Sequence, residues 1–97
     1  MATETTLWDP VDGLTSPEAE IAYLEAAFED GDPALIAAVI GDIARARGMT
    51  QIAREAGLSR EAMYKAFRRG GNPTLETLAS VVKALGMKLA IQAARPT

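Results

Sequence analysis

Glycines interrupt this sequence at short intervals, and the runs between them have the periodicity of α-helices. Gly31, Gly48, Gly57, Gly70 and Gly86 each follow a run in which apolar residues recur every three or four positions. Glycine commonly ends helices because it adopts the left-handed conformation at little steric cost. The chain is therefore predicted to be an all-α bundle of five helices with short connections, within one domain of 97 residues.

Two of the predicted helices open with the same start signal. Ser16 precedes Pro17 and Asp32 precedes Pro33, so that each pair joins an N-cap residue to a proline suited to the first turn. The second of these helices has a broad apolar stripe, which is made of Leu35, Ile36, Val39, Ile40 and Ile43. A stripe of this width predicts a central helix that packs on more than one side.

Three shorter helices are expected after residue 48. Thr50 is a candidate N-cap for the third helix and Ser59 for the fourth. The apolar residues expected to face the core are Ile21, Leu24 and Phe28 in the first helix, Met63, Ala66 and Phe67 in the fourth, and Leu75, Leu78, Val82 and Leu85 in the fifth.

The two ends of the chain differ from this helical domain, which is expected to span residues 16–86. Residues 1–15 are polar and lack periodicity, so they are predicted to be a flexible N-terminal arm. Residues 87–97 are predicted to be a strand-like tail, because Met87, Leu89 and Ile91 occupy alternate positions. A short C-terminal strand in an all-α chain would have to pair with another chain. A frayed tail, or an extended segment lying on the core, is the alternative.

The composition excludes several classes of function. The chain contains no cysteine and no histidine, which removes disulfides, thiolate metal sites and the commonest general base. No enzymatic activity and no cofactor are therefore expected. The longest apolar run, residues 34–40, is far shorter than the roughly 20 residues of a membrane helix, and the N-terminus lacks the pattern of a signal peptide. A cytoplasmic location without membrane contact is predicted.

Charge is divided sharply along the chain. Residues 1–42 contain ten acidic residues and no Lys or Arg, whereas residues 43–97 contain ten basic residues and three acidic ones. Glu18 and Glu20 fall in the first turn of the first predicted helix, where they complement its positive end. The formal net charge of −3 therefore conceals an acidic half and a basic half, which predict different partners.

Residues 53–67, with the sequence AREAGLSREAMYKAF, have the spacing of a DNA-binding helix-turn-helix. Ala53 is small enough for two helices to cross, Gly57 suits the tight turn, and Leu58 is an apolar plug behind it. Ser59 is placed to cap the second helix, and Met63 returns to the core. This phase directs a set of polar residues outward, toward the major groove in such a motif: Ser59, Arg60, Glu61, Tyr64, Lys65 and Arg68, with Arg69 and Gln51 beside them.

These residue types suit the chemistry of duplex DNA. Arg60 can bond both acceptors of a guanine edge, Glu61 can accept from cytosine or fix Arg60, and Tyr64 can contact a thymine methyl or a phosphate. Ser59 and the free N–H groups beside it suit a phosphate or a base edge. The predicted phosphate contacts are Gln51, Lys65, Arg68 and Arg69. The alternative is an ordinary helical hairpin with a solvated basic face.

Three blocks of the sequence resemble a known family: AYLEAAFEDGDPAL, IARARGMTQIAREAGLSREAMYKAF and GNPTLETLASVVKALGMKL. Through them, residues 7–89 resemble the HigA-like addiction module antidote family, the DNA-binding antitoxins of bacterial toxin–antitoxin pairs. The resemblance implies a five-helix, phage-repressor-like fold, binding of double-stranded operator DNA as a homodimer, and neutralisation of a small RNase toxin. It also places DNA reading on Ser59, Arg60, Glu61, Tyr64 and Lys65.

The sequence departs from the wider phage-repressor pattern at two places. There, a glutamine that often holds a phosphate lies four residues before the small crossing residue. Here Gln51 lies two residues before Ala53, and Met49 occupies the earlier place. Arg68 and Arg69 also make the end of the motif more basic than we expect for the family.

The resulting hypothesis is an antitoxin that represses its own operon as a homodimer, with the dimer contact in the tail or the last helix. Its acidic half would steer and hold a basic toxin. Two alternatives stay open. A stand-alone transcriptional repressor would have no tight basic partner, and a protein-interaction module would bind no DNA through this motif.

Overall fold

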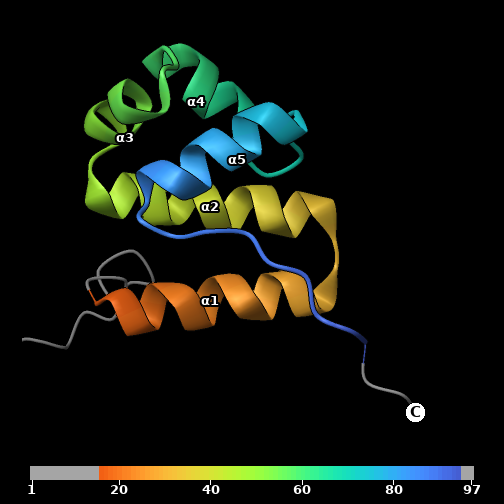
Figure 1. The fold of residues 1–97 in the computed structure, drawn as a ribbon. Coiled ribbons are helices and arrows are strands. Elements are labelled where there is room, and N and C mark those ends of the chain that lie inside the picture. Colours follow the sequence, from red (N-terminus) through yellow and green to blue (C-terminus); the bar gives the residue numbers. More distant parts are fainter. Residues whose placement is uncertain (1–15, 95–97) are drawn as a thin grey trace, which may run out of the picture.

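The computed structural model describes residues 16–94, and the chain forms five α-helices and no strand among these residues (Figure 1). The helices are α1 (Pro17–Asp30), α2 (Pro33–Arg47), α3 (Met49–Ala56), α4 (Arg60–Ala66) and α5 (Leu75–Ala84). The predicted all-α fold is confirmed. The predicted N-terminal arm, residues 1–15, and the last three residues of the tail lie outside the described residues. None of the described helices is both long and apolar enough to cross a membrane.

Local signals fix the ends of the first two helices. The Ser16 side chain accepts a hydrogen bond from the backbone N–H of Ala19 at 3.1 Å, and Asp32 accepts one from Ala34 at 3.0 Å. These bonds satisfy N–H groups that have no partner inside the helix. Gly31 ends α1 with a left-handed φ of 84°. The two start signals predicted from the sequence are confirmed.

Helix α2 lies at the centre of the molecule. In Figure 1, α1 runs antiparallel along one side of α2, and α3, α4 and α5 lie on the other side. Among the described helices, α1 contacts only α2, whereas α2 also contacts α3 and α4, and α3 contacts α5. The broad apolar stripe therefore serves two interfaces, as its width predicts.

One hydrophobic cluster joins the layers on the two sides of α2. Val39, Ile40 and Ile43 of α2 are almost completely buried within it. The other elements contribute Leu24, Ala27, Ile52, Ala53, Met63, Phe67, Val81 and Leu85. Burial of a large apolar side chain stabilises the folded state by about 1.5–3 kcal/mol, so this shared cluster makes the five helices one folding unit.

Gly41 allows α2 and the end of α4 to approach closely. A β-carbon at position 41 would lie 2.0 Å from the carbonyl oxygen of Phe67 and 3.2 Å from its carbonyl carbon. Those atoms are backbone, so they cannot move aside as the end of a flexible side chain can. The glycine therefore sets the distance between the central helix and the helix that carries most of the predicted DNA contacts.

Three details of the sequence interpretation are wrong. Thr50 does not cap α3, which begins at Met49 and has Gly48 at its cap position with no side-chain bond. Leu75 is 75 % exposed, because the buried residues of α5 lie in its second half, at Val81 and Val82. Ile21 and Phe28, at 44 % and 40 % exposure, are only partly covered, because α1 contacts a single neighbouring helix. In α1 the buried apolar positions are Leu24 and Ala27.

Residues 87–94 form no strand, contrary to the strand-like prediction. The backbone N–H of Met87 donates to the Val82 carbonyl at 3.1 Å, and the Met87 side chain packs against the core. The segment then continues alongside α1 without regular structure (Figure 1). Because no described segment of this chain offers a neighbouring strand, its backbone has no ladder to join. Of this segment only Met87 packs against the core, since residues 88–94 are all exposed. The alternatives, a frayed tail and an extended segment lying on the core, stay predictions.

Candidate functional site

A tight turn joins α3 to α4 and sets the relative direction of these two helices. Gly57 adopts a left-handed conformation with φ 76° and ψ 27°. Its N–H donates to the Arg54 carbonyl at 3.2 Å, and the N–H of Leu58 donates to the Ala53 carbonyl at 2.8 Å. A side chain at position 57 would strain this conformation, so the glycine predicted for the turn has the expected role.

The inner sides of α3 and α4 are apolar and buried. Ala53 and Met63 belong to the core cluster, and Leu58 packs against it. Ser59 is the N-cap of α4, and its hydroxyl accepts a hydrogen bond from the N–H of Ala62 at 3.0 Å. The crossing residue, the apolar plug and the cap are therefore where the sequence predicts them.

The outer side of the pair is polar and open to solvent. All eight residues predicted to contact DNA are exposed: Gln51, Ser59, Arg60, Glu61, Tyr64, Lys65, Arg68 and Arg69. Gln51 comes from the first turn of α3, and the others come from α4 and its two flanking turns. Seven of the eight therefore lie within residues 59–69, and Gln51 lies on the preceding helix.

Two contacts organise these exposed side chains. The Arg60 guanidinium lies over the Tyr64 ring, 5.5 Å from the ring centroid, and its Nη2 donates to the Tyr64 hydroxyl at 3.4 Å. Such a cation–π pair holds the guanidinium along the helix surface. On α3, Nε2 of Gln51 donates to Oε2 of Glu55 at 3.2 Å. Both contacts are exposed and leave most donors of these side chains available to a ligand.

The basic residues of this region have no carboxylate partners within residues 16–94. The two ion pairs in that part of the chain both lie on α1 and α2, between Asp42 and Arg45 and between Glu20 and Arg47. The cations of residues 49–71 instead face solvent: Arg54, Arg60, Lys65, Arg68 and Arg69. A surface of unneutralised cations is suited to binding an anion.

A second tight turn follows α4 and places its two terminal arginines. The N–H of Gly71 donates to the Arg68 carbonyl at 2.8 Å, and Gly70 has a φ of 84°. A β-carbon at Gly71 would lie only 2.3 Å from the Ala66 carbonyl oxygen. The turn is therefore held close to the end of α4, so Arg68 and Arg69 are kept next to the outer face of that helix.

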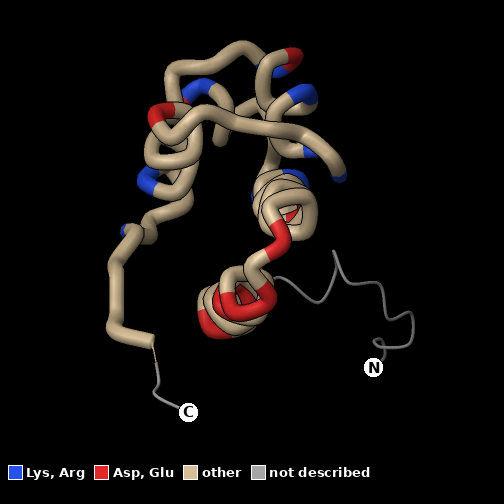
Figure 2. Tube along the Cα trace, turned by 90° about the vertical axis from the view of Figure 1, so that its right-hand side faces the viewer, with Lys and Arg blue, Asp and Glu red and all other residues tan. Residues whose placement is uncertain are grey.

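The acidic and basic halves of the sequence occupy different layers of the fold. Figure 2 views α1 and α2 nearly end-on, with acidic and no basic positions on α1 and most of the basic positions, beside a few acidic ones, in the layer formed by α3, α4 and α5. Five acidic residues lie on α1, at positions 18, 20, 25, 29 and 30, and no basic residue does. Since α2 stands between these layers and α1 contacts none of α3, α4 and α5, the two charged surfaces are spatially separate.

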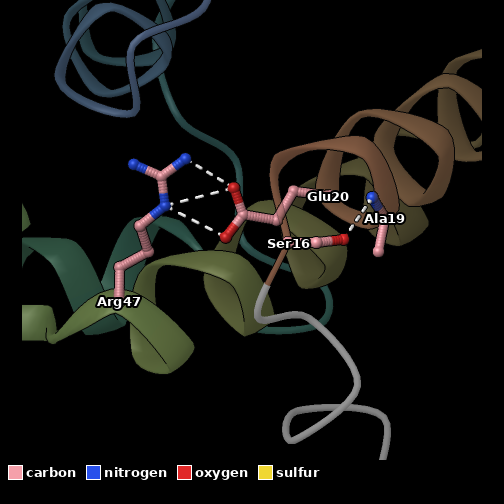
Figure 3. Close-up of polar contacts among 4 residues, drawn as sticks. All are labelled: Ser16, Ala19, Glu20 and Arg47. Carbon is pink, nitrogen blue, oxygen red and sulfur yellow. Dashed lines mark hydrogen bonds and ion pairs between the residues drawn. The ribbon is translucent and has the colours of Figure 1, made fainter.

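One polar pair was not foreseen from the sequence. Glu20 is 3 % exposed, and Nε of Arg47 donates to both of its carboxylate oxygens, at 3.1 and 3.0 Å, while Nη2 donates to one of them (Figure 3). These hydrogen bonds raise the pKa of Arg47 above its ordinary value. The burial of Glu20 could have been predicted from its spacing to Leu24 and Ala27, which puts the three residues on the same, buried face of α1. The pair clamps the start of α1 to the end of α2.

A second bond joins the same two helices. The Tyr23 hydroxyl donates to Oδ2 of Asp42 at 3.0 Å, and Asp42 also pairs with Arg45. Burial of Tyr23, together with this hydrogen bond, raises the pKa of the phenol above its ordinary value. The polar side chains between α1 and α2 are thus used to hold the fold together. No group of three or more potential metal ligands occurs in the described part of the chain.

The chain matches a protein family and a relative over nearly its whole length. The model of a family described as "probable addiction module antidote protein" matches residues 4–93. The chain is also 46 % identical over 88 residues to a Haemophilus influenzae protein named "Uncharacterized protein", and the match covers 91 % of each sequence. No solved structure matches the chain.

Proposed function

This chain belongs to the probable addiction module antidote protein family, and from that premise we propose that it is the antitoxin of a toxin–antitoxin pair that binds its own operator DNA through α3 and α4. In this proposal it neutralises a small basic toxin. The resemblance to the HigA-like family implies that this toxin is an RNase. The observation that carries the DNA-binding part is the set of exposed cations around α4, none of which has a carboxylate partner within residues 16–94.

Helices α3 and α4 act in this proposal as a helix-turn-helix. In that motif the second helix enters the major groove and presents its N-terminal residues to base edges. Helix α4 has the required features, because its buried side is fixed by Met63 and Phe67 while Arg60 and Tyr64 point into solvent. Because the inner side of α4 is fixed in the core, the outer side chains would enter the groove at one depth and one angle.

The exposed residues divide into base-reading and backbone-binding groups. We expect Arg60, in the first turn of α4, to bond a guanine edge, with its guanidinium held by Tyr64 one turn later. Lys65, Arg68 and Arg69 are expected to contact phosphates beside the groove. Gln51 already donates one of the two N–H groups of its side-chain amide to Glu55, so we expect its contribution to be the weakest.

A homodimer is part of the proposal. One short recognition helix spans only a few base pairs, which is too little for selection of a site in a genome. Two copies with recognition helices one turn of DNA apart, about 34 Å, read two half-sites of a palindrome. The acids of α1 oppose this arrangement only weakly. Two helix-packing distances of about 8–10 Å each, α1 to α2 and α2 to the α3–α4 pair, separate them from the basic face, which is about two screening lengths at physiological salt.

The first experiment measures binding of the full chain to the DNA upstream of its own gene and to a scrambled duplex of equal length. Fluorescence anisotropy at two salt concentrations gives the affinity, the sequence preference and the salt slope. We expect selective binding that weakens steeply as salt rises. Equal, weak binding of both duplexes would exclude the repressor function and leave binding of a protein partner as the activity to examine.

A further inference from the structure

An open groove lies between α1 and the C-terminal segment, on the face away from the α3–α4 turn. Its volume is about 760 Å³, and α1 lines one side of it with Ile21, Leu24, Glu25, Phe28 and Glu29. Residues 86–90 and Gln92 line the other side. Figure 2 shows the C-terminal segment passing down one flank of α1, away from α2. This groove takes no part in the surface assigned to DNA.

The groove combines exposed apolar side chains with carboxylates. Ile21 and Phe28 of α1 are 44 % and 40 % exposed, and Leu89 on the opposite wall is 43 % exposed. Glu25 and Glu29 lie along the same wall as the two α1 residues, and both are exposed. Large apolar side chains that stay this accessible inside one concave surface are typical of interaction sites.

We propose that this groove is the docking surface for a cationic, amphipathic segment of the toxin, whose apolar side chains contact Ile21, Phe28 and Leu89 while its Lys or Arg residues meet Glu25 and Glu29. This inference rests on the proposed antitoxin function and assigns that function to a specific surface. The carboxylates of the groove wall select a basic partner, and its apolar side chains supply affinity that salt does not screen.

A second copy of this chain fits the groove less well. In a two-fold symmetric dimer the same patch faces itself, so Glu25 and Glu29 of one copy would approach those of the other. Like charges at such a contact are repulsive, and Lys88 is the sole cation among the lining residues. Charge complementarity therefore favours a different, basic protein over self-association at this site.

The position of the groove allows both ligands to bind at once. Helix α1 contacts neither α3 nor α4, so a partner seated on α1 lies across the molecule from the DNA-binding face. The complex of toxin and antitoxin would then still reach the operator.

Matched pairs of variants of the full chain test the proposal, with the protein encoded beside it in the operon as the probe. Leu89→Ser removes an apolar wall residue, and its control Leu75→Ser removes an exposed leucine that does not line the groove. Glu25→Gln with Glu29→Gln removes two groove carboxylates, and its control Glu18→Gln with Glu76→Gln removes two exposed carboxylates outside it. Each pair keeps composition and net charge equal.

Calorimetric titration with the toxin is expected to show about a tenfold weaker affinity for each groove variant and little change for its control. The carboxylate variant should also lose part of the salt dependence. Operator binding and the circular dichroism spectrum should match wild type in all four proteins. Equal toxin affinities within each pair would overturn the docking site, as would a changed oligomeric state of Leu89→Ser with intact toxin binding. If wild-type protein does not bind the toxin at all, the antitoxin function itself fails.

Discussion

The α1–α2 hairpin and the α3–α4 pair are both two helices joined at a left-handed glycine, Gly31 in one and Gly57 in the other. They use their polar side chains in opposite ways. In the hairpin, Glu20 bonds to Arg47 and Tyr23 bonds to Asp42, so polar groups connect one helix to the next. In the α3–α4 pair the helices meet through apolar residues, and the polar contacts, such as Arg60 with Tyr64, stay within one helix.

This difference indicates which surface is free to bind a charged ligand. A guanidinium committed to a buried carboxylate, as in Arg47, cannot leave it without exposing an unpaired charge to a poorly solvated site. A guanidinium that rests on an exposed tyrosine can leave at little cost. The sequence contains many arginines, and their partners in the fold distinguish those that stabilise the protein from those whose guanidinium is available to a ligand.

The largest effect is expected where the two regions are joined. Phe67→Ala should lower the free energy of unfolding by about 3–5 kcal/mol, because Phe67 is almost completely buried at the end of α4, beside Gly41 of α2. Urea denaturation measures the change, and Leu75→Ala, at an exposed leucine, is the control with little effect. Equal changes in the two variants would mean that α4 is not anchored through this side chain.

The ion pair between α1 and α2 should respond asymmetrically to loss of either partner. Arg47→Met leaves the buried Glu20 carboxylate unpaired and should cost about 2–3 kcal/mol of stability. Glu20→Gln leaves an arginine whose side chain is 32 % exposed and can hydrate, so we expect about 1 kcal/mol. Thermal and urea unfolding give both values. A larger loss in Glu20→Gln would contradict the account of the pair, and neither change should alter operator affinity in folded protein.

On the exposed surface of the α3–α4 pair, Arg60→Ala should weaken operator binding and leave the free energy of unfolding almost unchanged. We expect operator binding to weaken by about 1–3 kcal/mol, with relaxed preference at one base pair, because one bidentate contact is lost. Anisotropy with a set of single-base operator variants measures this. Lys83→Ala, at an exposed lysine of α5, serves as a control for charge. Unchanged discrimination among the operators would remove Arg60 from the base-reading group.

Lys65→Ala tests whether Lys65 contacts a phosphate or a base. As a phosphate contact, Lys65 should affect all duplexes alike, and its loss should lower the salt slope of binding by about one unit. Affinities at four or five salt concentrations for operator and scrambled DNA give the slopes. A loss confined to the operator would instead place Lys65 among the base-reading residues.

The smallest effect is expected at Tyr23. Tyr23→Phe removes the hydrogen bond to Asp42 and should cost about 0.5–1.5 kcal/mol at neutral pH. The pKa of Tyr23 is raised above 10.0 in the folded chain, so its contribution is complete below pH 10 and is lost as the pH rises through the folded-state pKa. The stability difference between wild type and variant should therefore shrink in alkali. A difference that grows with pH would reverse the sign of the linkage.

The parts of this fold that the sequence predicted correctly are those controlled by close neighbours. Ser16, Asp32 and Ser59 cap helices because the bonded N–H groups lie two or three residues away. The exposure of the α4 residues follows from the spacing of Ala53, Gly57 and Met63. Such features need no knowledge of the rest of the molecule.

Features that depend on distant neighbours were missed. Glu20 was interpreted through its position in the first turn of α1, but its partner Arg47 is 27 residues away. Leu75 lies on the apolar stripe of α5, yet periodicity does not show where a neighbouring helix stops covering that stripe. The alternation at Met87 and Leu89 fits a strand, but a strand also requires a partner, and the described part of this chain supplies none.

Gly41 has a consequence for the recognition of similar proteins. Any residue other than glycine at this position would place a β-carbon on the backbone of Phe67. A relative that carries such a residue must therefore tilt or shift its fourth helix, and with it the exposed side chains of that helix. The identity of this one buried position should separate relatives that share this helix geometry from those in which the fourth helix is displaced.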